Sequence, residues 1–187
     1  ALAFNSSLEY SLIEIPTLEN FKEKKIIIAK ELIKSVTESC GIKDFKIIKN
    51  FKGTDFKNTI CSHPFLKLGF NYDVPMFEAG FVNLEQGTGI VHCAPSHGVD
   101  DFNLCLKNNI ESKYTVDDSG YYTKEIPHFV KTHVFKADPL VIEELKKEQK
   151  LLKDEKIQHS YPHSWRSKAP LIYRATPQWF ISMETNS

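Results

Sequence analysis

The stretch LEYSLIEI, residues 8–15, alternates apolar and polar side chains, and this period of two predicts a β-strand with one buried face. Pro16 follows directly and ends the strand, because proline has no N–H group to donate to a neighbouring strand. The next apolar run, KKIIIA at residues 24–29, is rich in β-branched side chains and predicts a second strand. Residues 45–51 alternate in the same way and predict a third.

Helical spacing occurs in three places. At residues 29–41 the apolar side chains share one helical face, and Gly41 is placed as a C-terminal cap. Residues 100–107 repeat apolar positions at the same spacing. Residues 138–152 give the strongest helix signal, since Asp138 can cap the first turn, a proline follows it, and acidic residues precede basic ones.

The order of these elements predicts the fold class. Two further strands are predicted at residues 81–84 and 89–93, joined by EQGTG in a hairpin-like connection, so short strands outnumber helices. We expect a mainly β fold with peripheral helices, in which a β-barrel closes or a sheet curves strongly. Residues 1–158 would form this core. Residues 159–187 would form an extended ribbon packed against something else, since residues 159–180 hold both tryptophans, both arginines and three prolines.

Composition sets limits on partners and location. The chain has 187 residues, enough for one core, and Lys plus Arg equal Asp plus Glu at 24 each, so any RNA contact would depend on a local patch. Arginine occurs only at Arg166 and Arg174, the candidates for bidentate phosphate contacts. The four cysteines form no Cys-x-x-Cys pair and no apolar run suits a signal or a membrane span, so we expect a reducing cytoplasm. The sequence begins at Ala1 without methionine, as expected of a fragment.

The densest group of reactive side chains is GTGIVHCAPSHGVDDF, residues 87–102. A zinc site would need three or four ligands, but His92 and Cys93 would point to opposite faces of a strand, so one of them is lost. The same geometry separates Cys93 from His92 as a nucleophile and its base, and leaves only His97, across a turn that holds a proline. The glycines lead into a strand with no following lysine, which disfavours a phosphate-binding loop.

Two interpretations remain for these residues. In one, the glycines shape a turn, His92 is a core or wall residue and Asp100 caps the following helix. In the other, Asp101 lies in the first turn of that helix, where N–H groups and the helix dipole hold it anionic and suit it to bind an ammonium group. His92 would lie across the same concavity, and its ring would limit the depth of the pocket. The second interpretation describes a pocket that recognises an amine of limited size.

Three segments carry a resemblance to a known family. GTGIVHCAPSHGVDDF resembles the signature of the editing domain inserted in isoleucyl-tRNA synthetases, which are class I aminoacyl-tRNA synthetases. VFKADPLVIEELKKEQKLL resembles the family's later helix, and HSYPHSWRSKAPLIYRATPQWFISM is similar to its return segment into the catalytic domain. The resemblance covers residues 3–183. Histidine at position 92 favours a resemblance to the isoleucine enzyme. The sister enzymes for valine and leucine look as if they have lysine or methionine at the corresponding position.

The resemblance implies hydrolytic editing of a misattached amino acid. Asp101 would bind the α-ammonium group of valine, and His92 would wall the pocket so that isoleucine does not fit. Five further residues are candidates for substrate binding: Gly87, Thr88, Gly89, His97 and Asp100. The implied partners are the acceptor end of tRNA(Ile), a valine ester or valyl adenylate, and the catalytic domain of the same polypeptide.

No metal or other cofactor is implied for this domain, and ATP with magnesium would serve only the synthetic site of a full-length enzyme. The family's pocket is completed by a threonine-rich segment that would precede Ala1, so hydrolysis by the isolated chain stays open. Two other functions also stay open. One is a non-catalytic module that binds the aminoacylated acceptor end of tRNA, and the other is a structural barrel whose conspicuous residues are caps and core.

Overall fold

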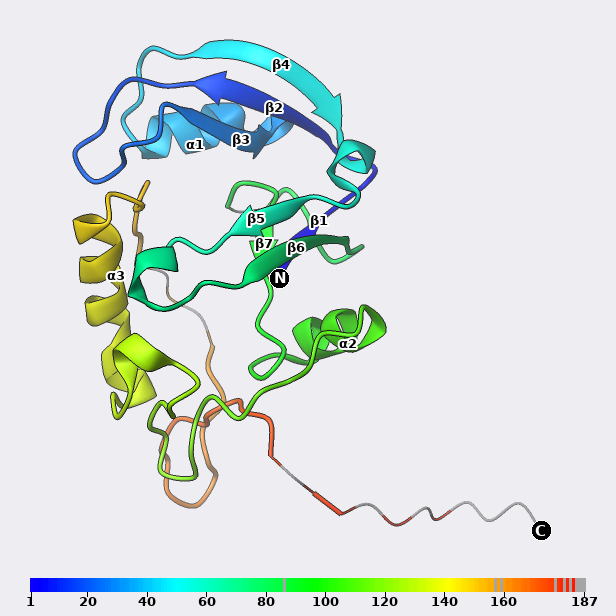
Figure 1. Ribbon diagram of the computed structural model, residues 1–187, viewed down its shortest axis with the longest axis vertical. Helices are drawn as coiled ribbons and strands as arrows, with labels where there is room; N and C mark the ends of the chain where they lie inside the picture. The colour runs from blue at the N-terminus through cyan, green and yellow to red at the C-terminus, as the bar shows by residue number, and fades with distance from the viewer. Residues whose placement is uncertain are drawn as a thin grey trace.

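The strands of the computed structural model form two sheets, one above the other in the view of Figure 1. The structure describes residues 1–85, 87–156, 158, 160–176, 178, 179, 181 and 183. Three antiparallel strands form one sheet in the order β3-β2-β4: Lys25–Ala29, Glu9–Glu14 and Lys46–Lys52. Four strands form the other in the order β5-β6-β1-β7: Ile60–Ser62, Asp73–Glu78, Leu2–Phe4 and Val91–His92.

The three-stranded sheet follows the local sequence pattern. β2 lies in the middle and pairs with β3 on one side and β4 on the other. After β3 a 3-10 turn, Lys30–Leu32, leads into α1, Ile33–Ser39, and Gly41 follows the helix with a left-handed φ of 68°. The strands and the helix predicted within residues 8–51 are therefore confirmed, with small differences at their ends.

The predicted β-barrel is wrong, although a mainly β fold with few helices does fit. Within the described residues no strand of one sheet pairs with a strand of the other, so each sheet keeps two edge strands. β1 joins β6 in parallel and β7 in antiparallel orientation, which makes the four-stranded sheet mixed. Its edge strands are only three residues long in β5 and two in β7, and a closed barrel needs a longer, staggered ladder around its whole circumference.

The predicted hairpin around EQGTG is also wrong. Residues 81–84 do not form a strand, and Val82 is buried in an apolar cluster instead. β7 pairs with β1, so that His92 lies opposite Leu2. Gln86, inside the predicted connection, lies outside the described residues. Val82 and Leu84 thus pack against the core instead of forming a strand, while Phe81 is exposed.

Two further α-helices flank the four-stranded sheet (Figure 1). α2 spans Val99–Lys107, as predicted to within one residue. α3 spans Ala137–Lys147 and ends before the predicted residue 152; its N-cap is Lys136, so Asp138 lies in the first turn instead of capping it. Four 3-10 turns lie between the other elements: Gly53–Phe56, Leu66–Leu68, Pro127–Phe129 and Val134–Lys136. In the described part of the chain, no helix has the length and apolarity to cross a membrane.

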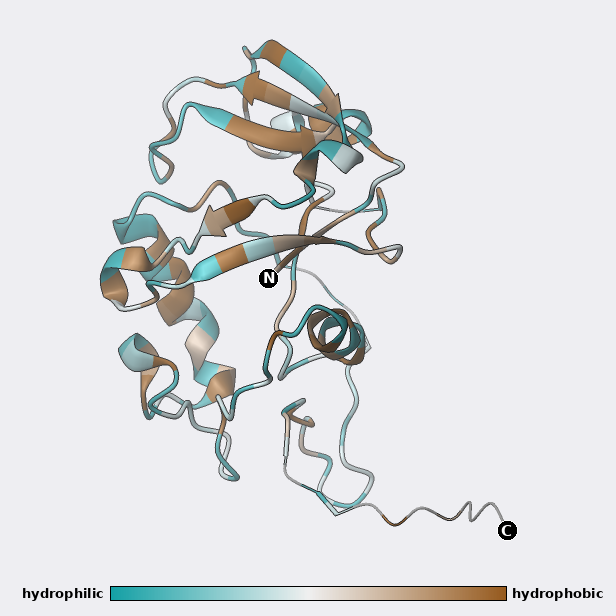
Figure 2. Cartoon of the chain, turned by 45° about the vertical axis from the view of Figure 1, so that its right-hand side comes forward, coloured by the Kyte–Doolittle hydropathy of each residue, from teal (hydrophilic) through white to brown (hydrophobic). Residues whose placement is uncertain are grey.

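Apolar residues follow the strands of both sheets (Figure 2). The larger core cluster lies mainly on the three-stranded sheet and α1, and its Tyr10, Ile13 and Ile28 are completely buried. It also includes Phe4 of β1 and Met76 of β6, so it reaches the four-stranded sheet. A smaller cluster joins the four-stranded sheet to α2: Ala3, Ala79, Val82, Cys93 and Leu104. Burial of one large apolar side chain contributes about 1.5–3 kcal/mol, so the smaller cluster fixes α2 against the sheet.

The chain after α3 runs in an extended path that doubles back once. His163 and Pro170 form an isolated antiparallel bridge, which closes a short hairpin-like loop. Part of the predicted ribbon lies outside the described residues: His159, Pro177, Phe180, Ser182 and residues 184–187. The boundary between residues 158 and 159 stays a prediction.

Candidate functional site

Four of the predicted pocket residues lie in the short stretch from the end of β7 into the first turn of α2: His92, His97, Asp100 and Asp101. β7 ends at His92, a turn follows, and α2 begins at Val99, so the strand end and the first helical turn are neighbours. His92 is exposed, whereas Cys93 is only 1% exposed and belongs to the core. The two side chains therefore lie on opposite faces, as the strand geometry predicts.

The His92 side chain is a neutral group in this setting. Desolvation lowers the pKa of His92, although its side chain retains solvent-exposed area. The Ala1 amino group and His97 also lower this pKa, while the carboxylate of Asp101 opposes them. The effect of Asp101 means that the two side chains lie within electrostatic range of each other. At neutral pH the imidazole is uncharged, which suits a wall better than a charged contact.

Asp101 lies in the first turn of α2, where backbone N–H groups and the helix dipole stabilise an anion. A Cβ atom built on Gly98 would lie 2.8 Å from the Asp101 Oδ2 atom, so the carboxylate folds back over Gly98. Asp100 is exposed in the same turn, and because Gly98 is the N-cap, Asp100 does not cap the helix. Asp101 is half-buried and lies nearer to the region of His92.

The GTG segment connects the two sheets. The Thr88 carbonyl accepts the Ala29 N–H group at 2.8 Å, and the Gly89 carbonyl accepts the Tyr10 hydroxyl at 2.8 Å. Gly89 is buried with a φ of 79°, and a Cβ atom there would lie 2.5 Å from the Cβ of Ala29. Gly87 is exposed with open space around it. Gly89 therefore serves packing, while Gly87 and the half-exposed Thr88 remain accessible to a ligand.

His97 has hydrogen-bond partners on both ring nitrogens. Its Nδ1 lies 2.9 Å from the Tyr173 carbonyl, and its Nε2 lies 2.9 Å from the Thr115 hydroxyl. Because a carbonyl only accepts, Nδ1 carries the proton, and in the neutral ring Nε2 accepts from the threonine. His97 thus ties the turn before α2 to the C-terminal ribbon. Its predicted contact with a substrate stays a prediction.

Cys93 does not have the properties of a nucleophile. Burial, followed by the nearby charge of Asp101, raises the pKa of Cys93 to about 12, so the thiol stays protonated. Among the described residues, no group of three or more His, Cys, Asp or Glu side chains is arranged to hold a metal ion.

His63, which no sequence pattern indicated, lies near the same site. Burial and the charge of His92 lower the pKa of His63, so the two histidines are in electrostatic range. The ring of His63 stacks on Phe70, with centroids 4.8 Å apart, and its Nδ1 accepts the Phe65 N–H group at 3.0 Å. No sequence signal could reveal this, because the contact depends on the strand order β5-β6-β1-β7.

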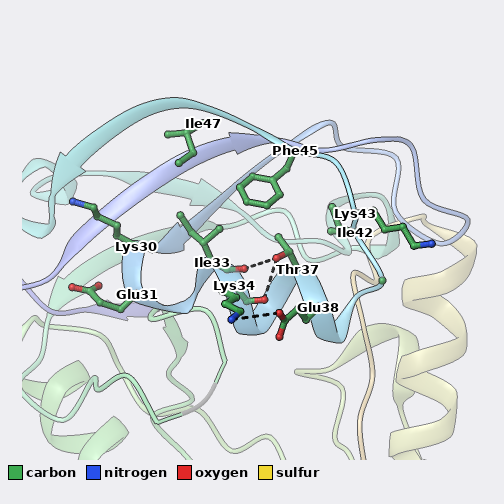
Figure 3. A pocket seen from close by; sticks show the side chains of 11 residues that line it. Lys30, Glu31, Ile33, Lys34, Thr37, Glu38, Ile42, Lys43, Phe45 and Ile47 are labelled. Carbon is green, nitrogen blue, oxygen red and sulfur yellow. Dashed lines mark hydrogen bonds and ion pairs between the residues drawn. The ribbon is translucent and has the colours of Figure 1, made fainter.

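An open groove of about 760 Å³ lies away from this site, between α1 and β4 (Figure 3). Its floor is apolar, with Ile33, Phe45 and Ile47, and lysines and glutamates stand at its rim. Lys34 pairs with Glu38 across one helical turn. This groove holds no histidine and no buried carboxylate, so its size alone does not make it the reactive site.

The two arginines of the chain lie in the C-terminal ribbon. Arg174 pairs with Asp118, with 2.8 Å between Nη2 and Oδ1. Arg166 lies over the ring of Trp165, with 5.3 Å to the centroid. A phosphate contact by Arg174 would therefore have to compete with an existing ion pair.

Comparisons with known proteins agree on one class of protein. Residues 13–154 match the family model described as "Leucyl-tRNA synthetase, editing domain". The isoleucine–tRNA ligase of Pelagibacter ubique (strain HTCC1062) is 63% identical over 186 residues, which are 100% of this chain and 21% of that protein. The isoleucine–tRNA ligase of Marinomonas sp. (strain MWYL1) is 40% identical over 98% of this chain and 19% of its own length. The chain thus spans about a fifth of the length of these relatives.

One solved structure is also similar. The crystal structure titled GlLeuRS-CP1 has a TM-score of 0.46 and 13% sequence identity, covering 80% of this chain and 59% of that one.

Proposed function

The chain belongs to the aminoacyl-tRNA synthetase editing-domain family, in its isoleucine–tRNA ligase group, and from this premise we propose that it hydrolyses valine wrongly attached to tRNA(Ile). A synthetic site for isoleucine cannot reject valine cleanly, because one missing methylene changes binding by only about 1–3 kcal/mol, a limit for which isoleucyl-tRNA synthetase is itself the standard example. A second pocket that admits valine and excludes isoleucine corrects the error.

One observation carries the proposal: an anionic Asp101 and a neutral His92 lie together at the junction of β7 and α2. The carboxylate would bind the α-ammonium group of the valine ester. The uncharged imidazole would close the side-chain pocket and leave no room for the extra methylene of isoleucine. Gly87 and Thr88, the accessible part of the GTG segment, would line the cleft near the terminal adenosine.

The reaction would be an attack of water on the ester carbonyl. The oxygen of the water bonds to the carbonyl carbon, the ester bond to the ribose breaks, and the ribose oxygen leaves as a hydroxyl after taking up a proton. The chain would contribute by fixing the ester in place through its ammonium group, and the neighbouring ribose hydroxyl would orient the water. The proposal requires no metal, cofactor or covalent intermediate.

The wider partners follow from the same proposal. The acceptor end of tRNA(Ile) would carry the ester, valyl adenylate would be a second possible substrate, and the catalytic domain would belong to the same polypeptide. Such an enzyme would work in the cytoplasm, where tRNA is charged.

The test compares hydrolysis of Val-tRNA(Ile) and Ile-tRNA(Ile) by this chain and by the Pelagibacter ubique ligase carrying this chain in place of its matching residues. Selective loss of the valyl ester is the expected result. Binding of the charged tRNA without hydrolysis by either protein would overturn the hydrolytic function and leave a recognition module.

Asp101→Ala in both proteins tests the ammonium contact. Loss of a charge-assisted hydrogen bond should reduce transition-state stabilisation by about 1.5–3 kcal/mol. This corresponds to a roughly 10- to 150-fold lower kcat/KM for the valyl ester. Asn103→Ala, at an exposed position of the same helix, is the matched control and should leave the rate unchanged. Wild-type hydrolysis by Asp101→Ala would rule out the anchor.

A further inference from the structure

The turn between β7 and α2, residues 93–98, separates the two side chains on which the proposed selectivity depends. His92 ends β7, and Asp101 lies in the first turn of α2. Gly98, the last residue of the turn, is the N-cap of α2, so the start of the helix follows from the path of the turn. The distance between His92 and Asp101 is therefore set by how this turn is held.

Two polar side chains in the middle of the turn are bonded to distant parts of the chain. Ser96 is 7% exposed, and its hydroxyl donates to the Lys113 carbonyl at 2.6 Å. The next residue, His97, has its Nε2 2.9 Å from the Thr115 hydroxyl and its Nδ1 2.9 Å from the Tyr173 carbonyl. The conformation of the turn therefore depends on the segment after α2 and on the C-terminal ribbon.

The partners of this imidazole are themselves held together. Thr115 begins a hairpin of residues 115–123, which backbone hydrogen bonds close. Val116, the second residue of the hairpin, is 1% exposed and fixes it in the interior. The ribbon contacts the same hairpin, because Arg174 pairs with Asp118 at 2.8 Å. The two contacts of the imidazole thus come from a common support.

These two contacts give the His97 ring one orientation. The Tyr173 carbonyl only accepts, so Nδ1 donates to it, and Nε2 of the neutral ring accepts from the Thr115 hydroxyl. A ring turned over about its Cβ–Cγ bond would place a carbon atom against each partner and lose both hydrogen bonds. The side chain is therefore fixed, and the backbone of the turn is fixed with it.

We infer that His97 is a positioning residue that determines selectivity: its two hydrogen bonds hold the turn so that His92 and Asp101 leave room for valine and not for isoleucine. The inference deepens the proposed function and rests on it for the identity of the two esters. A pocket rejects a ligand that is larger by one methylene only while its walls stay in place, so the side chains that support the walls take part in the selection. If the turn moved more freely, the gap would widen and isoleucine would enter.

Hydrolysis of Val-tRNA(Ile) and Ile-tRNA(Ile), by this chain and by the Pelagibacter ubique ligase that carries it, provides the first test. His97→Phe keeps an aromatic ring and removes both hydrogen bonds. It should raise hydrolysis of the isoleucyl ester and lower the ratio of valyl to isoleucyl kcat/KM roughly tenfold. Partial unfolding would slow both reactions, so a faster isoleucyl reaction reports a wider pocket. An unchanged ratio in a folded variant would overturn the inference.

Two further variants are the controls. His97→Asn places an amide nitrogen near the position of Nδ1, so it restores a donor to the Tyr173 carbonyl and should keep the ratio within roughly threefold of the wild type. His128→Phe makes the first change at an exposed histidine that pairs with Glu144 of α3, and it should leave the ratio unchanged. Equal losses in His97→Phe and in either control would overturn the inference.

Thr115→Val tests the same contact from its other side. Valine has nearly the shape of threonine but no hydroxyl, so the variant removes the donor to Nε2 and leaves the imidazole in place. The ratio should fall roughly two- to fivefold. Because this hydrogen bond is already lost in His97→Phe, adding Thr115→Val to that variant should lower the ratio no further. Losses that multiply in the double variant would overturn the inference.

Hydrogen exchange of backbone amides reports the turn without any substrate. The His97 N–H group donates to the Ala94 carbonyl at 3.0 Å, and the Phe102 N–H group donates to the Gly98 carbonyl at 2.9 Å. The protection of both amides should fall roughly tenfold in His97→Phe and stay unchanged in His128→Phe. Unchanged protection in His97→Phe would overturn the inference whether or not the chain hydrolyses esters. Lower protection in a chain that hydrolyses neither ester would support the positioning contacts while the proposed function fails.

Discussion

The three-stranded and the four-stranded sheets are built in different ways. The strands of the three-stranded sheet all come from residues 9–52. Its middle strand pairs with β4 along its whole length and with β3 from Tyr10 to Glu14. The four-stranded sheet collects strands from residues 2–92, and β7 contributes only two residues. The three-stranded sheet, here called the scaffold, is formed by strands that are close in the sequence. The four-stranded sheet depends on pairing between strands that are far apart in the sequence. The candidate site lies on the second.

The GTG segment makes one of the contacts between the two sheets. Thr88 and Gly89 bind Ala29 and Tyr10 of the scaffold through two hydrogen bonds, and β7 follows two residues later. These hydrogen bonds therefore help to fix the position of the candidate site relative to the three-stranded sheet. Variants in this contact separate the two regions most clearly.

Gly89→Ala should have the largest effect on stability. A left-handed φ costs alanine about 1–2 kcal/mol, and the clash with Ala29 at 2.5 Å adds about 1–3 kcal/mol, so the free energy of unfolding should fall by about 2–5 kcal/mol. Gly87→Ala has a similar φ of 74° but open space, and should lose only the first part. Urea denaturation measures both. Equal losses would mean that the two sheets do not meet tightly at Gly89.

Tyr10→Phe should have the next largest effect. The buried Tyr10 hydroxyl donates to the Gly89 carbonyl and accepts the Asn5 N–H group at 3.1 Å, so its removal leaves two backbone groups short of a partner. The expected loss is about 1–3 kcal/mol in the free energy of unfolding. Tyr114→Phe, at an exposed tyrosine, should change stability by less than about 0.5 kcal/mol. A similar loss in both variants would contradict the special role of the Tyr10 contact.

The smallest effect should be a pH dependence confined to the four-stranded region. Because desolvation lowers the pKa of His92 below its ordinary 6.5, the unfolded chain binds more protons than the folded chain in the window just below that value. The stabilising contribution is complete above pH 6.5 and is lost as the pH falls toward the folded pKa. His92→Gln should flatten this slope in denaturation curves between pH 5 and 7, leaving the share of His63, whose pKa is also lowered. An identical slope in the variant would show that His92 titrates normally.

The same contrast explains what could be predicted from the sequence. Alternation at residues 8–15, the helix before Gly41 and the helix at residues 99–107 are local patterns, and the structure confirms them. Barrel closure and the 81–84 strand are claims about pairing between distant segments, and both are wrong. Alternation of apolar residues predicts which side chains are buried, but it does not predict which strands pair with each other.

The site was partly predictable for the same reason. His92 and Asp101 are nine positions apart across one turn, so local geometry brings them together. The proximity of His63 to His92 could not be predicted, because it depends on the order of the four strands in the sheet. His97 was a candidate for substrate binding, and the sequence did not indicate its contact with Tyr173, which lies far along the chain in the C-terminal ribbon.

The hydrogen bonds of His97 connect the turn between β7 and α2 to the C-terminal ribbon. A displacement of Tyr173 either ruptures its 2.9 Å link to the imidazole or drags the imidazole with it, and the imidazole lies between the end of β7 and the start of α2. A shift of the ribbon at Tyr173 would therefore also act on the turn that separates His92 from Asp101.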